Sequence, residues 1–137
     1  MKKAYLILFI LSTVIMIECA GQLAIRQMMV EPPEVTEGSE ATILVVFTGQ
    51  KNTVSSVVAR LREDPEIVFS LNDNGESGDK MAGDNIWTYS VTVPLNTLAN
   101  TYHFDISARD LEGNEIITEG YEQQITGRSG TVEITVK

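Results

Sequence analysis

The sequence predicts an all-β domain, built as an antiparallel sandwich of about seven or eight short strands. Two observations lead to this prediction. From residue 42 onward the apolar residues recur with a period of two, which is typical of strands with one buried face. Clusters of Gly, Asn, Asp and Pro separate these runs about every 8 to 12 residues, as turns between short strands do. No segment beyond the N-terminal region has helical periodicity.

The expected strands follow one another along the chain. Pro32 and Pro33 favour an extended or edge path before the first clear strand. The run TILVVF at residues 42–47 is apolar on both faces and predicts a central strand that is covered on both sides. Runs with one apolar and one polar face come next, at residues 57–61, 67–71, 87–93, 102–108 and 132–136. Their number and spacing indicate a sandwich of the immunoglobulin kind.

The N-terminal region has the pattern of a targeting segment. Two lysines precede an uncharged apolar stretch at residues 4–17, and Glu18 ends this stretch below the roughly 20 residues that a spanning helix needs. We therefore expect three parts in the chain, namely a signal peptide at residues 1–18, a short stem at residues 19–29 and the sandwich domain at residues 30–137.

Cys19 is the only cysteine and directly follows the apolar stretch. It has no partner for an intrachain disulfide. The sequence MIEC at residues 16–19 resembles the lipobox of bacterial lipoproteins, and this resemblance implies that Cys19 becomes a lipidated N-terminus anchored in a membrane. The alternative is cleavage after CAG, which would leave Gln22 as the N-terminus of a secreted protein.

The charge balance narrows the range of partners. The chain has 10 Lys and Arg against 19 Asp and Glu, which gives a formal net charge of −9. Binding a nucleic-acid backbone requires a basic face that releases counterions, so we expect no nucleic-acid partner. An acidic balance favours solubility and is compatible with binding cations.

The most distinctive stretch is LNDNGESGDKMAGDNIWTYSVTV at residues 71–93. Its glycines permit positive φ angles, so the backbone can fold into successive tight turns that bring three aspartates together. Calcium binds six to eight oxygen ligands from carboxylates, amides, carbonyls and water. The candidate metal ligands are Asn72, Asp73, Asn74, Asp79 and Asp84.

A metal-free loop explains the same residues. Each aspartate could accept backbone N–H hydrogen bonds in an Asx turn, and Lys80 could supply part of the countercharge. The loop is not an EF-hand, because no glutamate falls at the twelfth position from Asp73 and no flanking helices are expected. Without His or Cys it is a poor site for a soft transition metal. The sequence leaves calcium and the metal-free loop as open alternatives.

A resemblance to a known class of modules covers this loop and the strand after it. The runs LNDNGESGDKMAGDNIWTY and NTYHFDISARDLEGN resemble two signatures, DDGxxGDxxAGDGxY and YxFxVxAxDxxGN, of immunoglobulin-like or fibronectin-III-like modules in bacterial secreted proteins and lipoproteins. The chain differs at Asn74, where the modules often have aspartate, and at Asn85, where they have glycine. The resemblance implies the fold and an extracellular location.

The remaining polar candidates argue against catalysis. His103, the only histidine, falls on the polar face of its expected strand, and no motif supplies it with a catalytic partner. Ser77 and Lys80 form an SxxK pattern, but they lie in a glycine-rich turn and lack the companion motifs of serine acyl-enzymes. We therefore expect a protein that is not an enzyme.

The aromatic residues bear on sugar binding, which uses exposed rings. Trp87 and Tyr89 share a face with valines, so alternation predicts that both belong to the core. Tyr102 is expected in the core as well, with its hydroxyl hydrogen-bonded back to the chain near a corner of the sandwich. Tyr121 is the one aromatic in a polar setting and the candidate sugar platform.

These observations together predict a noncatalytic module exported to the bacterial cell envelope. It would be lipid-anchored in the periplasm or at the cell surface and would serve a structural or protein-interaction role. Its partners would be the membrane, through the anchor, and an unidentified envelope protein or polysaccharide. The alternative function is a carbohydrate-binding or adhesion module of the cell surface.

Overall fold

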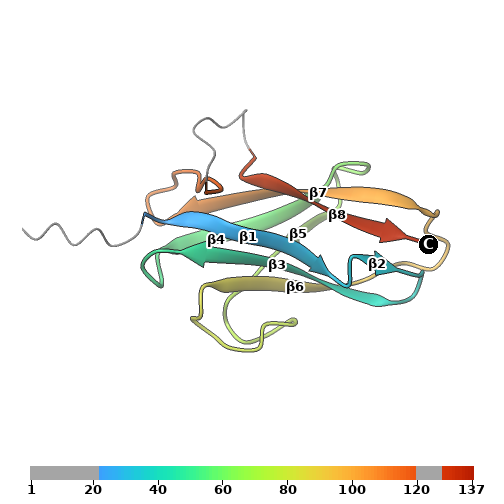
Figure 1. Ribbon diagram of the computed structural model, residues 1–137, viewed down its shortest axis with the longest axis horizontal. Helices are drawn as coiled ribbons and strands as arrows, with labels where there is room; N and C mark the ends of the chain where they lie inside the picture. Colours follow the sequence, from blue (N-terminus) through green and yellow to red (C-terminus); the bar gives the residue numbers. More distant parts are fainter. Residues whose placement is uncertain (1–21, 120–127) are drawn as a thin grey trace, which may run out of the picture.

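The computed structural model describes residues 22–119 and 128–137, which form two facing β-sheets (Figure 1). The predicted signal peptide, Cys19 and Tyr121 lie outside the described residues. The strands are β1 (Ala24–Glu31), β2 (Glu34–Val35), β3 (Glu40–Thr48), β4 (Val54–Leu61), β5 (Val68–Ser70), β6 (Ile86–Thr92), β7 (Asn100–Asp110) and β8 (Gly130–Val136). In the described part of the chain there is no helix of the length and apolarity that crossing a membrane requires.

The strand order is that of an immunoglobulin-like sandwich. One sheet has three strands in the order β1-β3-β6, and the other has five in the order β2-β8-β7-β4-β5. All pairs are antiparallel except the short pair of β2 with β8, which is parallel. The predicted all-β fold and its strand count are confirmed.

The core lies between the two sheets and follows the predicted alternation. On β3, for example, Ala41, Ile43, Val45 and Phe47 are buried while the residues between them are partly exposed. The most deeply buried large side chains are those of Ile25, Ile43, Val45, Val57 and Ile106. Burying a side chain of this size stabilises the fold by about 1.5–3 kcal/mol, so the contact between the sheets is the main source of stability.

The stem expected at residues 19–29 is wrong in its second half. Strand β1 begins at Ala24 and pairs with β3 along its length, so residues 24–29 belong to the sandwich rather than to a stem. Ala24 and Ile25 are both buried. The register shifts between Ile25 and Gln27, which breaks the period of two within this strand. Alternation therefore failed to reveal β1, and the predicted domain boundary at Val30 was too late.

Strand β3 is central, as predicted, but it is not buried on both faces. It lies between β1 and β6, and its inward side chains are buried. Thr42, Leu44 and Val46 are only half-buried, because they point to the outer face of the three-stranded sheet. An apolar run can thus mark a central strand in a sandwich without a second covering layer.

The aromatic residues pack as alternation predicts, with some exposure. Trp87, Tyr89 and Tyr102 are half-buried and pack against the core. The ring of Phe69 on β5 stacks on Tyr89 with centroids 5.1 Å apart, which joins the two sheets. The Tyr102 hydroxyl donates a hydrogen bond of 2.8 Å to the carbonyl of Leu98. The expected return bond of Tyr102 to the chain is confirmed.

A charged cluster lies on the five-stranded sheet around Asp105. Its carboxylate accepts hydrogen bonds from the Arg62 guanidinium at 2.7 Å and from the Thr131 hydroxyl at 3.1 Å, and Arg128 lies 3.6 Å away. Partial burial acts to raise the pKa of Asp105, but the hydrogen bonds from Arg62 and Thr131 and the charges of both arginines outweigh it. The pKa therefore lies below the ordinary aspartate value.

Replacement of Asp105 is expected to have a pH-dependent effect. A carboxyl whose pKa is lower in the folded chain stabilises the fold above its unfolded pKa of about 3.9, and this contribution is lost as pH falls through the folded value. Asp105→Asn should therefore lower the Tm at pH 7, and the difference from the parent should shrink below about pH 4. Melts from pH 7 to pH 3, with the exposed Glu112→Gln as a control, test this. A difference that is constant with pH would contradict it.

Candidate functional site: an aspartate cluster in the loop between β5 and β6

The distinctive loop connects β5 of one sheet with β6 of the other. It starts from the buried Leu71 and returns to the sandwich at Asn85. Backbone bonds of 2.9 and 3.0 Å between Asn72 and Thr88 close its base, and the Ser90 N–H donates to the Ser77 carbonyl at 3.0 Å. The loop is therefore attached to the sandwich at its base and at its middle.

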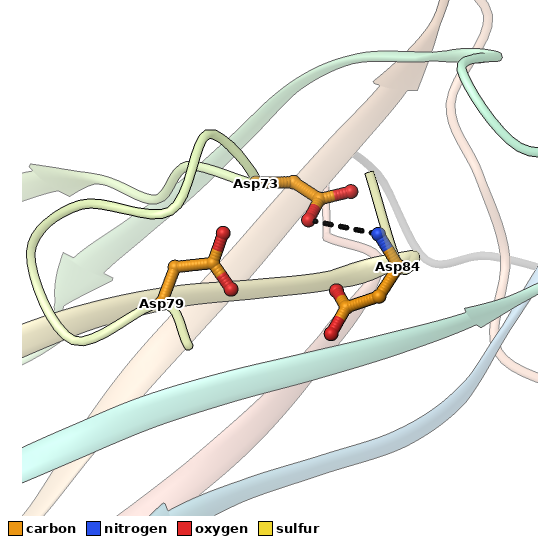
Figure 2. A group of neighbouring side chains, drawn as sticks. All are labelled: Asp73, Asp79 and Asp84. Atoms are coloured by element: carbon orange, nitrogen blue, oxygen red, sulfur yellow. Dashed lines mark hydrogen bonds between the residues drawn. The ribbon is translucent and has the colours of Figure 1, made fainter. Parts of the chain in front are cut away.

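Three aspartates of this loop lie together, as the sequence predicts. Asp73, Asp79 and Asp84 each offer a carboxylate oxygen, and these oxygens lie within 4.8 Å of one another. Figure 2 shows the three carboxylates converging from different parts of the loop. Asp79 is only 7% exposed, while the other two are half-buried. Three oxygens at this spacing can take part in binding a hard cation.

The same carboxylates also hold the loop backbone. Oδ1 of Asp73 accepts hydrogen bonds from the N–H groups of Gly83 and Asp84 at 3.0 and 3.3 Å, and its Oδ2 accepts one from Asn85 at 3.1 Å. Asp79 accepts a bond of 2.7 Å from the Gly75 N–H. The Asp73 carboxylate thus accepts hydrogen bonds from three successive N–H groups, ten to twelve residues further along the chain.

Asx turns account for part of the loop, as the metal-free alternative expects. Oδ1 of Asp84 accepts a hydrogen bond from the Ile86 N–H at 3.0 Å. The amide oxygen of Asn72 accepts one from the Asn74 N–H, and that of Asn74 accepts one from the Glu76 N–H, at 3.3 and 3.0 Å. In both asparagines, the amide oxygen that could otherwise bind a metal accepts a backbone hydrogen bond within a turn.

The cluster carries negative charge that the described residues do not pair. Partial burial raises the pKa of Asp73, and the neighbouring Asp84 raises it further by contact and by charge, against the backbone hydrogen bonds that lower it. The ion pairs between described residues involve other carboxylates, and Lys80 is exposed and takes part in none of them. A cation would relieve this repulsion.

The spacing of the loop adds to the case for a cation. Counting from Asp73, Gly78 is sixth and Asp84 is twelfth, the positions at which an EF-hand loop has its glycine and its last carboxylate. Strands flank this loop instead of helices, and the third position is glycine. The loop therefore shares part of the spacing of a calcium loop without its helical frame.

Asn85 belongs to this site but is not among the metal ligands that the sequence predicts. It is buried, it has a φ of 63°, and its side-chain amide donates to the Gly49 carbonyl at 3.4 Å. Asparagine tolerates this left-handed conformation better than most residues with a side chain. Its place in the signature, where the similar modules have glycine, was the signal for a positive φ at this position.

His103 lies between two glutamates. Its Nδ1 is 2.6 Å from Glu63 and its Nε2 is 3.2 Å from Glu133, and the imidazole is about a quarter exposed. On the polar face predicted for it, the ring is half-buried rather than fully exposed. Partial desolvation acts to raise the pKa of Glu63, but hydrogen bonds from His103 outweigh it and lower that pKa. Both ring nitrogens are thus engaged with carboxylates.

Comparison with known proteins gives only distant structural matches. No protein-family model matches the chain, and no curated protein matches it by sequence. A Pseudomonas fluorescens alkylpurine DNA glycosylase, AlkC, bound to DNA with an abasic site analog, is similar over 85% of this chain at 12% identity and a TM-score of 0.48. The chain covers 31% of that glycosylase.

A Niemann-Pick type C2 protein from the Japanese carpenter ant is similar over 86% of this chain and 95% of its own, at 14% identity and a TM-score of 0.44. Likenesses this distant do not transfer an activity or a ligand to this chain.

Proposed function

We propose that this protein is a noncatalytic module of the bacterial cell envelope whose loop between β5 and β6 is stabilised by calcium. The observation that carries the proposal is the convergence of three aspartate carboxylates within 4.8 Å, with no ion pair to a described cation. Calcium is the common extracellular ion that prefers such oxygen ligands. Asp73, Asp79 and Asp84 would hold it, with backbone carbonyls and water completing the shell.

A noncatalytic role agrees with the chemistry of the described residues. The imidazole of His103 has a glutamate at each nitrogen, so it has no free nitrogen to activate a serine or a water molecule. Ser77 and Lys80 are both exposed in the loop, which leaves the SxxK pattern without the buried setting of an acyl-enzyme. A structural or interaction role needs none of these groups.

The envelope location rests on the N-terminal sequence. The apolar stretch at residues 4–17 and the lipobox-like MIEC at residues 16–19 support export and lipidation of Cys19. A lipid on Cys19 would hold the sandwich close to a membrane, because β1 begins five residues later at Ala24. The sheets and loops would then be presented to another envelope protein or to a polysaccharide.

Calcium should raise the melting temperature of the purified protein. At a free concentration 100 times the Kd, calcium that binds only the folded state adds about 2.7 kcal/mol, which corresponds to a Tm increase of about 10 °C for a domain of this size. Melts in EDTA and across a calcium titration measure the effect. The intact mass of the protein isolated from membranes shows whether Cys19 carries a lipid.

Two variants separate metal binding from turn formation. The double variant Asp79→Asn, Asp84→Asn keeps an acceptor oxygen at each turn but removes two charges, so it should melt near the parent in EDTA and lose the response to calcium. Asp110→Asn is the matched control, because Asp110 also accepts two backbone N–H bonds in a turn but lies outside the cluster. Equal calcium responses in all three proteins would show that the cluster is not the site.

A further inference from the structure

The second notable feature of the sandwich is a cavity between its two sheets. Its volume is about 640 Å³, within the roughly 300–1,000 Å³ range of small-molecule sites. Residues of both sheets line it, including Ile43 of β3, Val91 of β6, Phe69 of β5 and Phe104 of β7. It is separate from the aspartate cluster, whose three residues do not line it.

The lengths of the two edge strands explain why this space is open. Strand β6 is the edge of the three-stranded sheet and has seven residues, whereas β5, the edge of the five-stranded sheet, has three. The shorter edge does not cover β6 along its whole length. The chain before β5 borders the opening with Ile67, and the chain after β6 borders it with Pro94 and Thr97.

The chemistry of the cavity wall points to an aliphatic ligand. Most of the lining side chains are apolar, and those of Phe69, Tyr89 and Val91 are only half-buried, so they keep surface that a ligand can contact. Each methylene group moved from water into such a space is worth about 0.8 kcal/mol. One apolar side chain at the opening is exposed as well, since Ile67 is 38% exposed.

The charged residues at the opening indicate which charge the polar head group of a ligand would carry. The two charged residues among the described lining residues are Glu63 and Asp64, and both are acidic. Glu63 and Glu133 both contact the imidazole of His103. Of these three side chains, only His103 can carry positive charge. Asp64 is exposed in the turn between β4 and β5. This opening attracts a cation and repels an anion.

We propose that the cavity binds the aliphatic chain of a small amphiphile whose head group is cationic. The chain lies between the sheets against Phe69, Tyr89 and Val91, and the head lies at the opening beside Glu63 and Asp64. The ligand class goes beyond the envelope role proposed above and does not depend on calcium.

Isothermal titration calorimetry with three ligands of equal chain length tests the proposal. Dodecylamine should bind one to one, dodecanol more weakly, and dodecanoate about tenfold or more weaker than the amine, because only the head charge differs. The binding should have a negative heat-capacity change, the mark of apolar burial. Butylamine, which has the same head without the long chain, should not bind measurably. Butylamine binding as tightly as dodecylamine, or no binding of dodecylamine at all, would overturn the proposal.

Variants of the full protein locate the site. Asp64→Lys should weaken dodecylamine about tenfold and strengthen dodecanoate, whereas Glu66→Lys, in the same turn but outside the lining, should change neither by much. Val91→Phe fills the cavity and should abolish binding of all three ligands, with a melt confirming that the variant is folded. Identical affinities in the parent and in Asp64→Lys would rule out the assigned opening.

Discussion

Asp73→Ala should strongly destabilise the loop between β5 and β6. The variant leaves the N–H groups of Asp84 and Asn85 without their acceptor in a partly buried loop, whereas the Gly83 N–H keeps its second acceptor, the Asp73 carbonyl at 3.0 Å. Each lost hydrogen bond of this kind costs about 1 kcal/mol or more, so the free energy of unfolding should fall by about 2 kcal/mol. That is a large part of the 5–15 kcal/mol that stabilises a typical domain.

Urea unfolding in EDTA measures this effect without any contribution from metal. Asp73→Asn retains one oxygen and should lose less than Asp73→Ala, because only the bond from the Asn85 N–H then lacks its acceptor. Asp110→Ala is the matched control, since Asp110 accepts two backbone bonds in an exposed turn where water can replace it. Equal losses for Asp73→Ala and Asp110→Ala would mean that the loop does not depend on Asp73.

Gly78→Ala should also lower the free energy of unfolding by about 3 kcal/mol. Gly78 has a φ of 93°, which a residue with a side chain adopts only at a cost of about 1–3 kcal/mol. A methyl group at this position would also overlap the Ser90 hydroxyl of β6 and approach Thr42 of β3. Either the Ser90 hydroxyl, which lies 3.3 Å from the Thr42 hydroxyl, or the loop itself would have to move to accept it.

The matched variant for this effect is Gly83→Ala. Gly83 has a φ of 74°, but no atom lies within 4 Å of the position its side chain would take. Its replacement should cost only the conformational strain, about 1–2 kcal/mol. Urea unfolding of both variants measures the difference, which reports the contact of the loop with Ser90. If the two variants are equally stable, the loop does not pack closely on the sheet.

Much of the aspartate cluster could be predicted from the sequence because the loop is local. Asp73 and Asp84 are eleven residues apart, and the glycines between them mark the turns that bring them together. Which side-chain oxygens of the loop accept backbone hydrogen bonds could not be predicted. Asn72 and Asn74 have the same ligand chemistry as the aspartates, but their oxygens accept backbone bonds in Asx turns. That choice depends on the conformation of each turn.

The sequence by itself determined the strands that alternate regularly, the core faces of those strands and the place of the loop. These features depend on the period of two and on turn residues, both of which are local. The core positions of Trp87, Tyr89 and Tyr102 follow from the same rule.

Only the tertiary structure decided three other features. Strand β1 was hidden by the register shift after Ile25 and is revealed by its pairing with β3. His103 gains its two glutamate neighbours from distant strands and turns. The cavity exists because β5 is shorter than the β6 edge that it faces, with Ile43 and Phe104 on opposite walls. Such features join residues far apart in the chain, and the free energy that selects them comes from packing the two sheets together.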